Sequence, residues 1–276
     1  MGSVEHDVNE LQEGFMPLYV STRGNKKLKQ LLEAVNQDQE LEELWRMANV
    51  NAMDRIGMSD HGGVHIQIVA NACVKIMRLL VGAGVEPNVV SDHGMTVEDA
   101  EVVVVLAACL HDVGMSIHRD HHENYSLIIG YPKARELLSG LYEEPHLTTM
   151  VSEVLHAVIA HRGEEKCLTV EAGVVKVADA LDMTEGRSRI PFEAGEVNIH
   201  AVSAMAVSDV SIKSGDERPV RLDIEMNNSS GIFQVDELLK RKLVNSSITQ
   251  YIEVLAHIES EGDSKQERRL VEVYRL

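Results

Sequence analysis

The segment TVEDAEVVVVLAACLHD, residues 96–112, decides the fold of this chain. Thr96 is followed three residues later by Asp99, which is the capping-box pattern that begins many helices. The four valines at 102–105 are typical of a strand, but the apolar run is long and begins as a helix begins. We therefore predict a buried helix that ends at Asp112.

Helical spacing of apolar residues extends over most of the first two thirds of the chain. The predicted helical segments cover residues 26–57, 64–81, 121–140, 146–161 and 170–184. The sequence GAG at 82–84 is interpreted as the stop of the second segment. Residues 1–25 lack strong periodicity and are interpreted as an extended lead-in.

The pattern changes after about residue 186. Residues 204–214 and 219–226 alternate or are β-branched on either side of the turn-like sequence SGDERP, which predicts a hairpin. An amphipathic helix is predicted from Val235 to about Glu261, and RLVEVYRL at 269–276 is predicted to be a final strand. The predicted fold class is mainly α: a helical domain over residues 26–190, followed by a small α+β module with the order β-β-α-β over residues 191–276.

The composition indicates a globular protein with a strongly acidic surface. Aromatic residues make up only 4% of the 276 residues, so the core is expected to consist of Val, Leu, Ile, Ala and Met, which suits packed helices. The formal net charge of −18 repels phosphate backbones and anionic membranes, so general nucleic-acid binding and membrane binding are not expected. An anionic substrate would need metal ions or clustered Arg.

Features of the chain favour a reducing, cytoplasmic location. Cys73, Cys109 and Cys167 lie far apart and form no CxxC motif, so they are interpreted as small buried residues. No apolar run approaches the ~20 uncharged residues that cross a bilayer. The acidic N-terminus has no signal-peptide pattern, and His6 stands where a myristoylation motif requires Ser or Thr.

Histidine and aspartate recur at the ends of the predicted helices. They occur at His61 and His65, at His111 and Asp112, at His118, His121 and His122, at His156 and His161, and at Asp179 and Asp182. Imidazole combined with carboxylate suits Zn, Mn, Fe or Ni. One Asp can bridge two ions ~3.5–4 Å apart, and two divalent ions would supply the positive charge that an anionic substrate needs.

The order His65, then the doublet His111-Asp112, then Asp179 resembles the signature of the HD-domain superfamily of metal-dependent phosphohydrolases. The resemblance is carried by HIQIVANACVKI, VLAACLHDVGM and VVKVADALD, and it covers roughly residues 60–190. It implies an HD-domain-like helical bundle. It also implies that these four residues bind the first metal ion, with Asp112 bridging to a second ion where one is present.

Dinuclear members of the superfamily carry two further histidines, which the resemblance places at His122, in HHENYS, and at His161, in AVIAHRG. The neighbouring His118 and His121 remain alternatives to His122, because the segment after Asp112 is short. His156 is a lower-ranked substitute for His161. The resemblance thus implies two divalent transition-metal ions.

The sequence departs from the HD-GYP group of cyclic-dinucleotide phosphodiesterases. Met115 stands where that group usually has Lys, and RGEEKC follows His161 in place of Gly-Tyr-Pro. The Gly-Tyr-Pro at 130–132 lies in the wrong position. Hydrolysis of cyclic-di-GMP is therefore not favoured.

Several further residues are candidates for contact with substrate. Arg187 and Arg189, shortly after the last metal ligand, and Lys176 are interpreted as phosphate contacts, or else as salt-bridge partners of nearby carboxylates. His61 or His118 would protonate the leaving group, since the ordinary pKa of histidine, ~6.5, suits proton transfer. His61 is alternatively an auxiliary residue that orients a ligand, a role that Asp60 fits equally well. Asp182 is interpreted as a residue that caps or braces the helix of Asp179 without contacting metal.

The favoured function is hydrolysis of a phosphate ester by a metal-activated water. The enzyme would be a phosphomonoesterase or a phosphodiesterase, and its substrate a nucleotide or another small phosphorylated metabolite. Two alternatives stay open. One is a di-iron oxygenase of the same superfamily, and the other is a non-enzymatic sensor that binds metal or ligand.

The polar turn NNSSG at 227–231 would bind an anion, contact another subunit or only connect two secondary-structure elements. Exposed sheet edges predict a homodimer.

Overall fold

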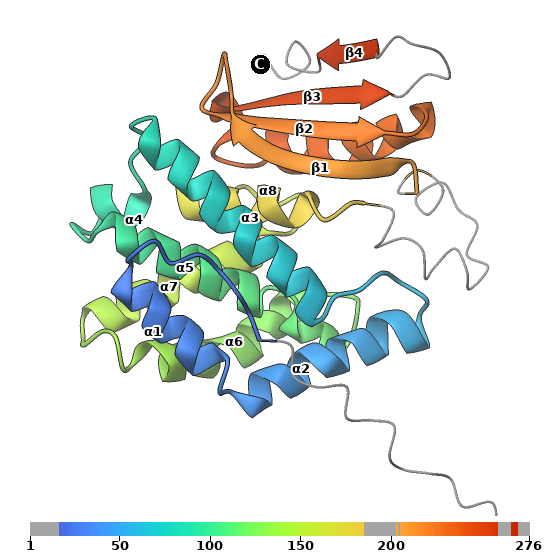
Figure 1. The fold of residues 1–276 in the computed structure, drawn as a ribbon. Coiled ribbons are helices and arrows are strands. Elements are labelled where there is room, and N and C mark those ends of the chain that lie inside the picture. The colour runs from blue at the N-terminus through green and yellow to red at the C-terminus, as the bar shows by residue number, and fades with distance from the viewer. Residues whose placement is uncertain (1–16, 185–202, 204, 259–265, 270–276) are drawn as a thin grey trace, which may run out of the picture.

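The computed structural model describes residues 17–184, 203, 205–258 and 266–269. Figure 1 shows a layer of packed helices below a small sheet, with α3 and α8 between the lower helices and the strands. This arrangement confirms the predicted fold class, a mainly helical chain with a small α+β module. The predicted boundary between residues 190 and 191 lies outside the described residues.

The helical part follows the predicted segments closely. Its helices are α1 (Lys26–Val35), α2 (Gln39–Asn49), α3 (Gly63–Gly82), α4 (Asn88–Ser91), α5 (Val97–Leu110), α6 (His122–Leu138), α7 (His146–Ala160) and α8 (Val170–Ala180), with a π-helical turn, η2 (Val50–Arg55), and a 3-10 turn, η3 (Val113–Ser116). The stretch predicted as helical over 26–57 is divided, because the Asp38 side chain accepts a hydrogen bond from the Leu41 amide and starts a new helix there.

Helix α5 is the centre of this bundle. Every residue from Asp99 to Leu110 is buried, including the four consecutive valines, and α5 contacts α1, α3, α7 and α8. Both hydrogen bonds of the predicted capping box at Thr96 and Asp99 are present. A helix that is apolar on all sides is stable only when other helices surround it, and here they do.

A buried polar cluster holds the start of α5 in place. One oxygen of Asp99 lies 2.6 Å from the ammonium of Lys27 and accepts a hydrogen bond of 2.5 Å from the hydroxyl of Tyr142. Burial raises the pKa of this carboxyl, but the bonds from Lys27 and Tyr142 outweigh it, so the pKa lies below its ordinary value. The ionised Asp99 thus joins the N-terminal helix, α5 and the end of α6.

The C-terminal strands form one sheet in the order β1-β2-β3-β4, comprising β1 (Val207–Ser214), β2 (Val220–Met226), β3 (Ile252–Ile258) and β4 (Gln266–Arg269). The predicted hairpin of β1 and β2 is confirmed as an antiparallel pair. Between β2 and β3 the chain passes through a π-helical turn, η5 (Gln234–Leu239), and a short helix, α11 (Lys240–Val244). Strand β3 then pairs parallel to β2.

The predicted helix from Val235 to Glu261 is therefore wrong in its second half. Residues Ile252–Ile258 form strand β3, in which all five residues from Ile252 to Ala256 are buried. Ile252, Leu255 and Ala256 have the i, i+3, i+4 spacing of a helix face, and pairing with β2 decides for the strand. Of the predicted last strand, 269–276, only its first residue lies in β4, and residues 270–276 lie outside the described residues.

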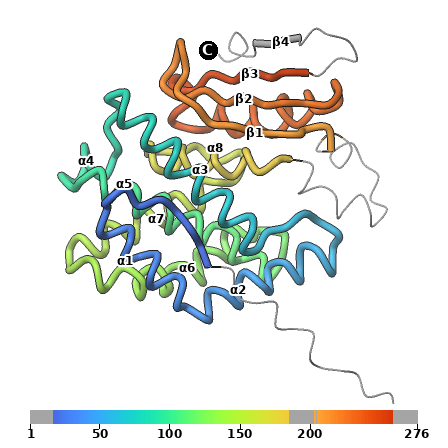
Figure 2. Tube along the Cα trace, in the orientation of Figure 1, coloured from blue at the N-terminus to red at the C-terminus, as the bar shows by residue number. Residues whose placement is uncertain are grey.

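The sheet module packs directly on the helical part. Figure 2 shows the strands lying along α3 and α8, and α3 contacts both β1 and β2. The connection between β2 and β3 also packs on this side, because η5 and α11 contact α8. Residues from the C-terminal module are thereby brought to the helix that carries Asp179.

One described helix, α3, is long and apolar enough by length and composition to cross a membrane. In the structure its buried residues pack against α5 and α8, and the helix carries the buried His65. These are the properties of a helix in the core of the bundle.

We predict that Asp99→Asn lowers the free energy of unfolding at neutral pH by about 1–3 kcal/mol, the usual effect of weakening a buried charge-assisted hydrogen bond. Because the folded-state pKa of Asp99 is depressed, its contribution is complete above the unfolded-state pKa of about 3.9 and is lost as pH falls through the lower folded-state value. Urea unfolding of wild type and variant between pH 7 and pH 2.5 measures this difference.

The exposed Glu98, one residue earlier on α5, provides the control, and Glu98→Gln should change stability by less than about 0.5 kcal/mol. An Asp99→Asn penalty that stayed constant down to pH 2.5 would contradict the ionised state assigned to Asp99.

Candidate metal centre

All six predicted metal ligands meet inside the helical part, and each comes from the end of a helix. His65 lies in the first turn of α3, His111 and Asp112 directly follow α5, His122 begins α6, His161 directly follows α7, and Asp179 lies in the last turn of α8. The bundle therefore converges on one polar point in an otherwise apolar core.

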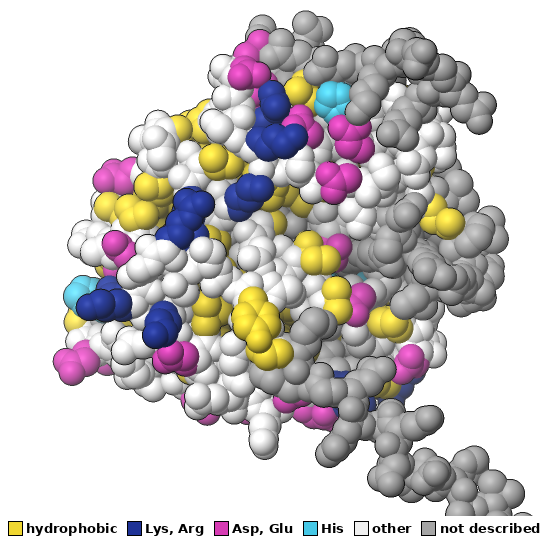
Figure 3. All heavy atoms as spheres, viewed as in Figure 1, with side chains coloured by type: hydrophobic (Ala, Val, Ile, Leu, Met, Phe, Trp, Pro, Cys, Tyr) yellow, Lys and Arg dark blue, Asp and Glu magenta, His cyan; other side chains and the backbone are white. Residues whose placement is uncertain are grey.

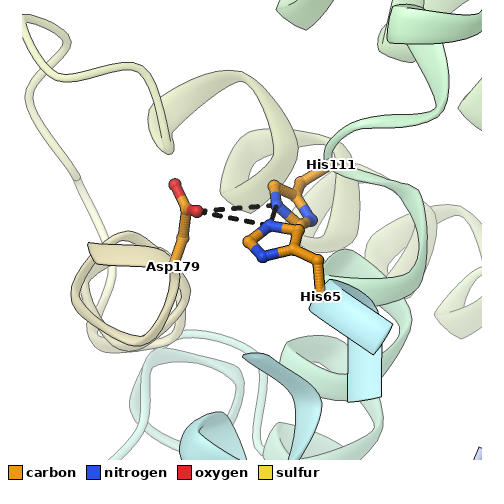
Figure 4. Close-up of side chains that lie close together, drawn as sticks. All are labelled: His65, His111 and Asp179. Atoms are coloured by element: carbon orange, nitrogen blue, oxygen red, sulfur yellow. Dashed lines mark hydrogen bonds and ion pairs between the residues drawn. The ribbon is translucent and has the colours of Figure 1, made fainter. Parts of the chain in front are cut away.

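The first group consists of His65, His111 and Asp179, whose side chains point toward one another in Figure 4. The Nε2 atoms of His65 and His111 lie 3.1 Å apart, and Oδ1 of Asp179 lies 3.5 Å from the first and 3.8 Å from the second. Both histidines are fully buried. Two imidazoles and one carboxylate at these separations can share one divalent ion.

The second group consists of Asp112, His122 and His161. Oδ1 of Asp112 lies 3.2 Å from Nε2 of His122 and 3.6 Å from Nε2 of His161. Its other oxygen, Oδ2, lies 3.5 Å from Nε2 of His65 and 3.4 Å from Nε2 of His111. Asp112 thus presents one oxygen to each group, which is the geometry of a carboxylate that bridges two ions.

The four clustered histidines all direct the same ring nitrogen toward the centre. In each of them the opposite nitrogen, Nδ1, is close to an acceptor: Asp182 Oδ2 at 2.6 Å for His65, Ala108 O at 2.8 Å for His111, Arg119 O at 2.9 Å for His122 and Val158 O at 2.5 Å for His161. Donation from Nδ1 leaves the lone pair of Nε2 for a metal ion, as in most histidine-metal sites. Asp182, expected only to cap or brace the helix of Asp179, here lies against the ring of His65.

Electrostatics place the acidic ligands in the form that binds metal. Burial raises the pKa of Asp112, but the adjacent His111 and hydrogen bonds from His122 and His65 bring it well below its usual range. The pKa of Asp179 also lies below its usual range, because Lys242 and the nearby histidines outweigh the effect of burial. Both carboxyls are therefore anionic at neutral pH.

Two of the imidazoles are held neutral. Burial, together with the adjacent His111, lowers the pKa of His161 to about 3, and burial also lowers the pKa of His111. In His122 the hydrogen bond and charge of Asp112 exceed the effect of burial, so the pKa of His122 is raised. Neutral imidazole is the form that binds metal.

Two local contacts position the ligands. Gly114 packs so tightly that a Cβ atom there would lie 2.0 Å from the carbonyl oxygen of His122, so only glycine lets α6 approach the turn after Asp112. Asp60 fixes the start of α3, since its Oδ1 accepts hydrogen bonds from the amides of Gly62 at 3.0 Å and His65 at 3.1 Å.

The histidines considered as alternatives to His122 and His161 lie outside both groups. His118 is exposed, and its Nδ1 accepts a hydrogen bond from the amide of Asp120 at 2.9 Å. His121 is exposed in the left-handed backbone region directly before α6. His156 accepts a hydrogen bond from the amide of Leu168 at 3.0 Å. His122 and His161 are the residues that the fold brings to the centre.

Of the residues predicted to contact substrate, only some lie near the two groups. His61 is buried beside the first group, with its ring centroid 5.7 Å from that of His65 and its Nδ1 2.7 Å from the carbonyl oxygen of Ser59. Lys176 is buried and donates to the carbonyl of Glu165, a contact outside both groups. Arg187 and Arg189 lie outside the described residues.

One residue at the centre was not predicted from the sequence. Lys242, on α11, forms an ion pair with Oδ2 of Asp179, the oxygen that faces away from His65 and His111. The two residues are 63 positions apart in the sequence. The run KRKL on an amphipathic segment is common on solvated helix faces, so no local signal distinguishes Lys242.

Comparisons with known proteins agree with this geometry. The family model described as HD domain matches residues 69–184, a range that contains five of the six ligands and begins just after His65. The uncharacterized protein MJ1020 of Methanocaldococcus jannaschii is 39% identical to this chain over 233 residues, which cover 84% of this chain and 90% of that protein. No solved structure gives a significant match.

We predict that His122→Ala reduces the number of bound ions from two to one per chain, because it removes one imidazole of the second group and leaves the first group intact. Elemental analysis of protein reconstituted with Mn²⁺ and freed of excess ion measures the ratio. His156→Ala is the matched control and should retain two ions. An unchanged ratio in His122→Ala would exclude His122 as a ligand.

A second prediction concerns Gly114. Gly114→Ala forces the new methyl group against the backbone of His122, so we expect a loss of about 1–3 kcal/mol in the free energy of unfolding and weaker binding of the second ion. Gly63→Ala, where a Cβ meets nothing within 4 Å, should change stability by less than about 1 kcal/mol. Urea unfolding and metal titration of the two variants test the difference, and equal behaviour would show that the contact at Gly114 is unimportant.

Proposed function

Because this chain belongs to the HD-domain superfamily of metal-dependent phosphohydrolases, we propose that it hydrolyses a phosphate ester of a nucleotide or of another small phosphorylated metabolite. The reaction would take place at a site for two divalent transition-metal ions, of Mn, Fe, Zn or Ni. The six buried side chains of the two groups would hold them.

The observation that supports this proposal best is the position of Asp112. Its two oxygens are divided between the groups, each within 3.2–3.6 Å of two imidazole nitrogens. A salt bridge that only stabilises the fold would not require four Nε2 atoms to converge on two buried carboxylates, so this arrangement favours a metal site. Imidazoles and ionised carboxylates at these distances fit a pair of transition-metal ions.

Two divalent ions held by these six side chains would lower the pKa of a bound water and polarise a phosphoryl oxygen. The residues of the chain have separate tasks. Asp182 and the three carbonyl acceptors keep the imidazole rings in orientation, and Asp112 keeps the two groups in register. His61 borders the first group, where its imidazole would protonate the leaving oxygen, while its contact with Ser59 fixes the ring.

The charge of the protein favours a small substrate over a polymer. The net charge is −18, and Figure 3 shows Lys and Arg side chains interspersed with Asp and Glu on the face drawn there, with no continuous basic surface on its described part. We propose that the protein acts in the cytoplasm on small phosphorylated compounds. We also propose a homodimer, since β1 lies at one end of the described sheet and has only β2 as a partner there.

The test is a screen of phosphomonoesters and phosphodiesters with Mn²⁺-loaded full-length protein, measuring the release of phosphate or alcohol. Chelation should abolish turnover, and Asp112→Asn should lower kcat at least about 10²-fold, the size of effect expected when charge stabilisation of the transition state is lost. His156→Ala should retain turnover.

Turnover that survives chelation and the loss of Asp112 would contradict the proposal. Protein that purifies with iron and consumes oxygen, but hydrolyses none of the esters, would indicate the oxidative alternative.

A further inference from the structure

The sheet module contributes a cation to the metal centre. Lys242 lies on α11, in the connection between β2 and β3, and its ammonium pairs with Oδ2 of Asp179. Since Oδ1 of Asp179 faces His65 and His111, the carboxylate is divided between the first group and this lysine.

Lys242 contacts the most exposed of the six clustered side chains. The side chain of Asp179 is 11% exposed, compared with 0% for His65 and His111 and 5–7% for Asp112, His122 and His161. Lys242 itself is 22% exposed, so its ammonium lies beside the centre and is also accessible to solvent.

The backbone around Lys242 is held by contacts with the segment between α7 and α8. Asn245 donates from its side chain to the carbonyl of Gly163 at 2.9 Å, and its own carbonyl accepts from the amide of Cys167 at 3.0 Å. The hydroxyl of Ser247 donates to the carbonyl of Thr169 at 2.5 Å. These bonds fix α11 against the helical part, so the lysine approaches Asp179 from a rigid position.

Other cations near the centre are engaged differently. Arg119 lies behind the ring of His122, with Nη1 2.8 Å from Nδ1, on the side opposite the ring nitrogen that faces Asp112. Lys176 is buried on the carbonyl of Glu165. In the part of the chain that the structure describes, Asp179 is the one hydrogen-bond partner of the Lys242 ammonium. An ammonium has three donors, so two remain for a ligand on the open side.

We propose that Lys242 binds a phosphoryl oxygen of the substrate, so that the C-terminal module forms one wall of the substrate site. This inference rests on the proposed function, because it takes the ligand to be a phosphate group beside the metal ions. In a protein of net charge −18 a fixed ammonium beside the centre adds attraction for an anion that the ions alone do not supply. It also ties substrate binding to the docking of α11.

The probe for this proposal is inorganic phosphate, the common product of phosphomonoester hydrolysis. Its dissociation constant is measured by isothermal titration calorimetry on the Mn²⁺-loaded full-length protein, for wild type, Lys242→Met and Lys240→Met. Lys240 lies on the same short helix and has no ion pair within the described residues, which makes it the matched control. We expect the phosphate constant to rise about tenfold or more in Lys242→Met and to stay unchanged in Lys240→Met.

A second measurement separates phosphate binding from a purely structural role. The affinity for Mn²⁺ should be equal to or higher than that of wild type in Lys242→Met, since a cation beside a metal ligand is removed, and Lys242→Arg should restore part of the phosphate affinity. Asn245→Ala, which loosens α11, should weaken phosphate binding while Lys242 is still present. Equal phosphate affinity in wild type and Lys242→Met at full Mn²⁺ occupancy, or no binding by wild type, would overturn the proposal.

The outcome also distinguishes this proposal from the proposed function. Ester hydrolysis together with unchanged phosphate affinity in Lys242→Met would reject the role of Lys242 and leave the hydrolase intact. The expected change in phosphate affinity without hydrolysis of any ester would reject the hydrolase and leave Lys242 as an anion contact.

Discussion

Burial of α5 on every side is the constraint on which the structure depends. A helix with no polar face must be enclosed, so α1, α3, α7 and α8 pack around it, and its C-terminal end lies deep in the bundle. The doublet His111-Asp112 stands directly after that end and is therefore buried as well. Two buried polar side chains need partners, and the surrounding helix ends supply them.

The centre shows how an apolar core can tolerate this much polarity. Each clustered imidazole has an acceptor for Nδ1, and Asp112 and Asp179 face the remaining ring nitrogens, so the six side chains form one connected network. Burial alone would make both carboxyls neutral, but the cationic and hydrogen-bonding neighbours reverse that effect. The network thereby keeps both carboxylates ionised within the core.

The sheet module is part of the same arrangement. It packs on α3 and α8, the two helices that carry His65 and Asp179, and its connecting helix α11 brings Lys242 to the centre. A change in how the module docks would alter the ion pair between Lys242 and Asp179. The module and the bundle are thus linked at Asp179.

The sequence by itself determined the elements whose signals are local. The capping box at Thr96 and the helical spacing depend only on near neighbours in the chain, and the helices predicted from them agree with the structure. The order of His65, His111-Asp112 and Asp179 was identified by its resemblance to a family signature, and the structure brings these side chains together. Only the tertiary structure decided between helix and strand for Ile252–Ile258, because pairing with β2 supplies hydrogen bonds that no local pattern encodes. It also brought Lys242 to Asp179, since this contact joins residues 63 positions apart and exists only once α11 has docked on α8.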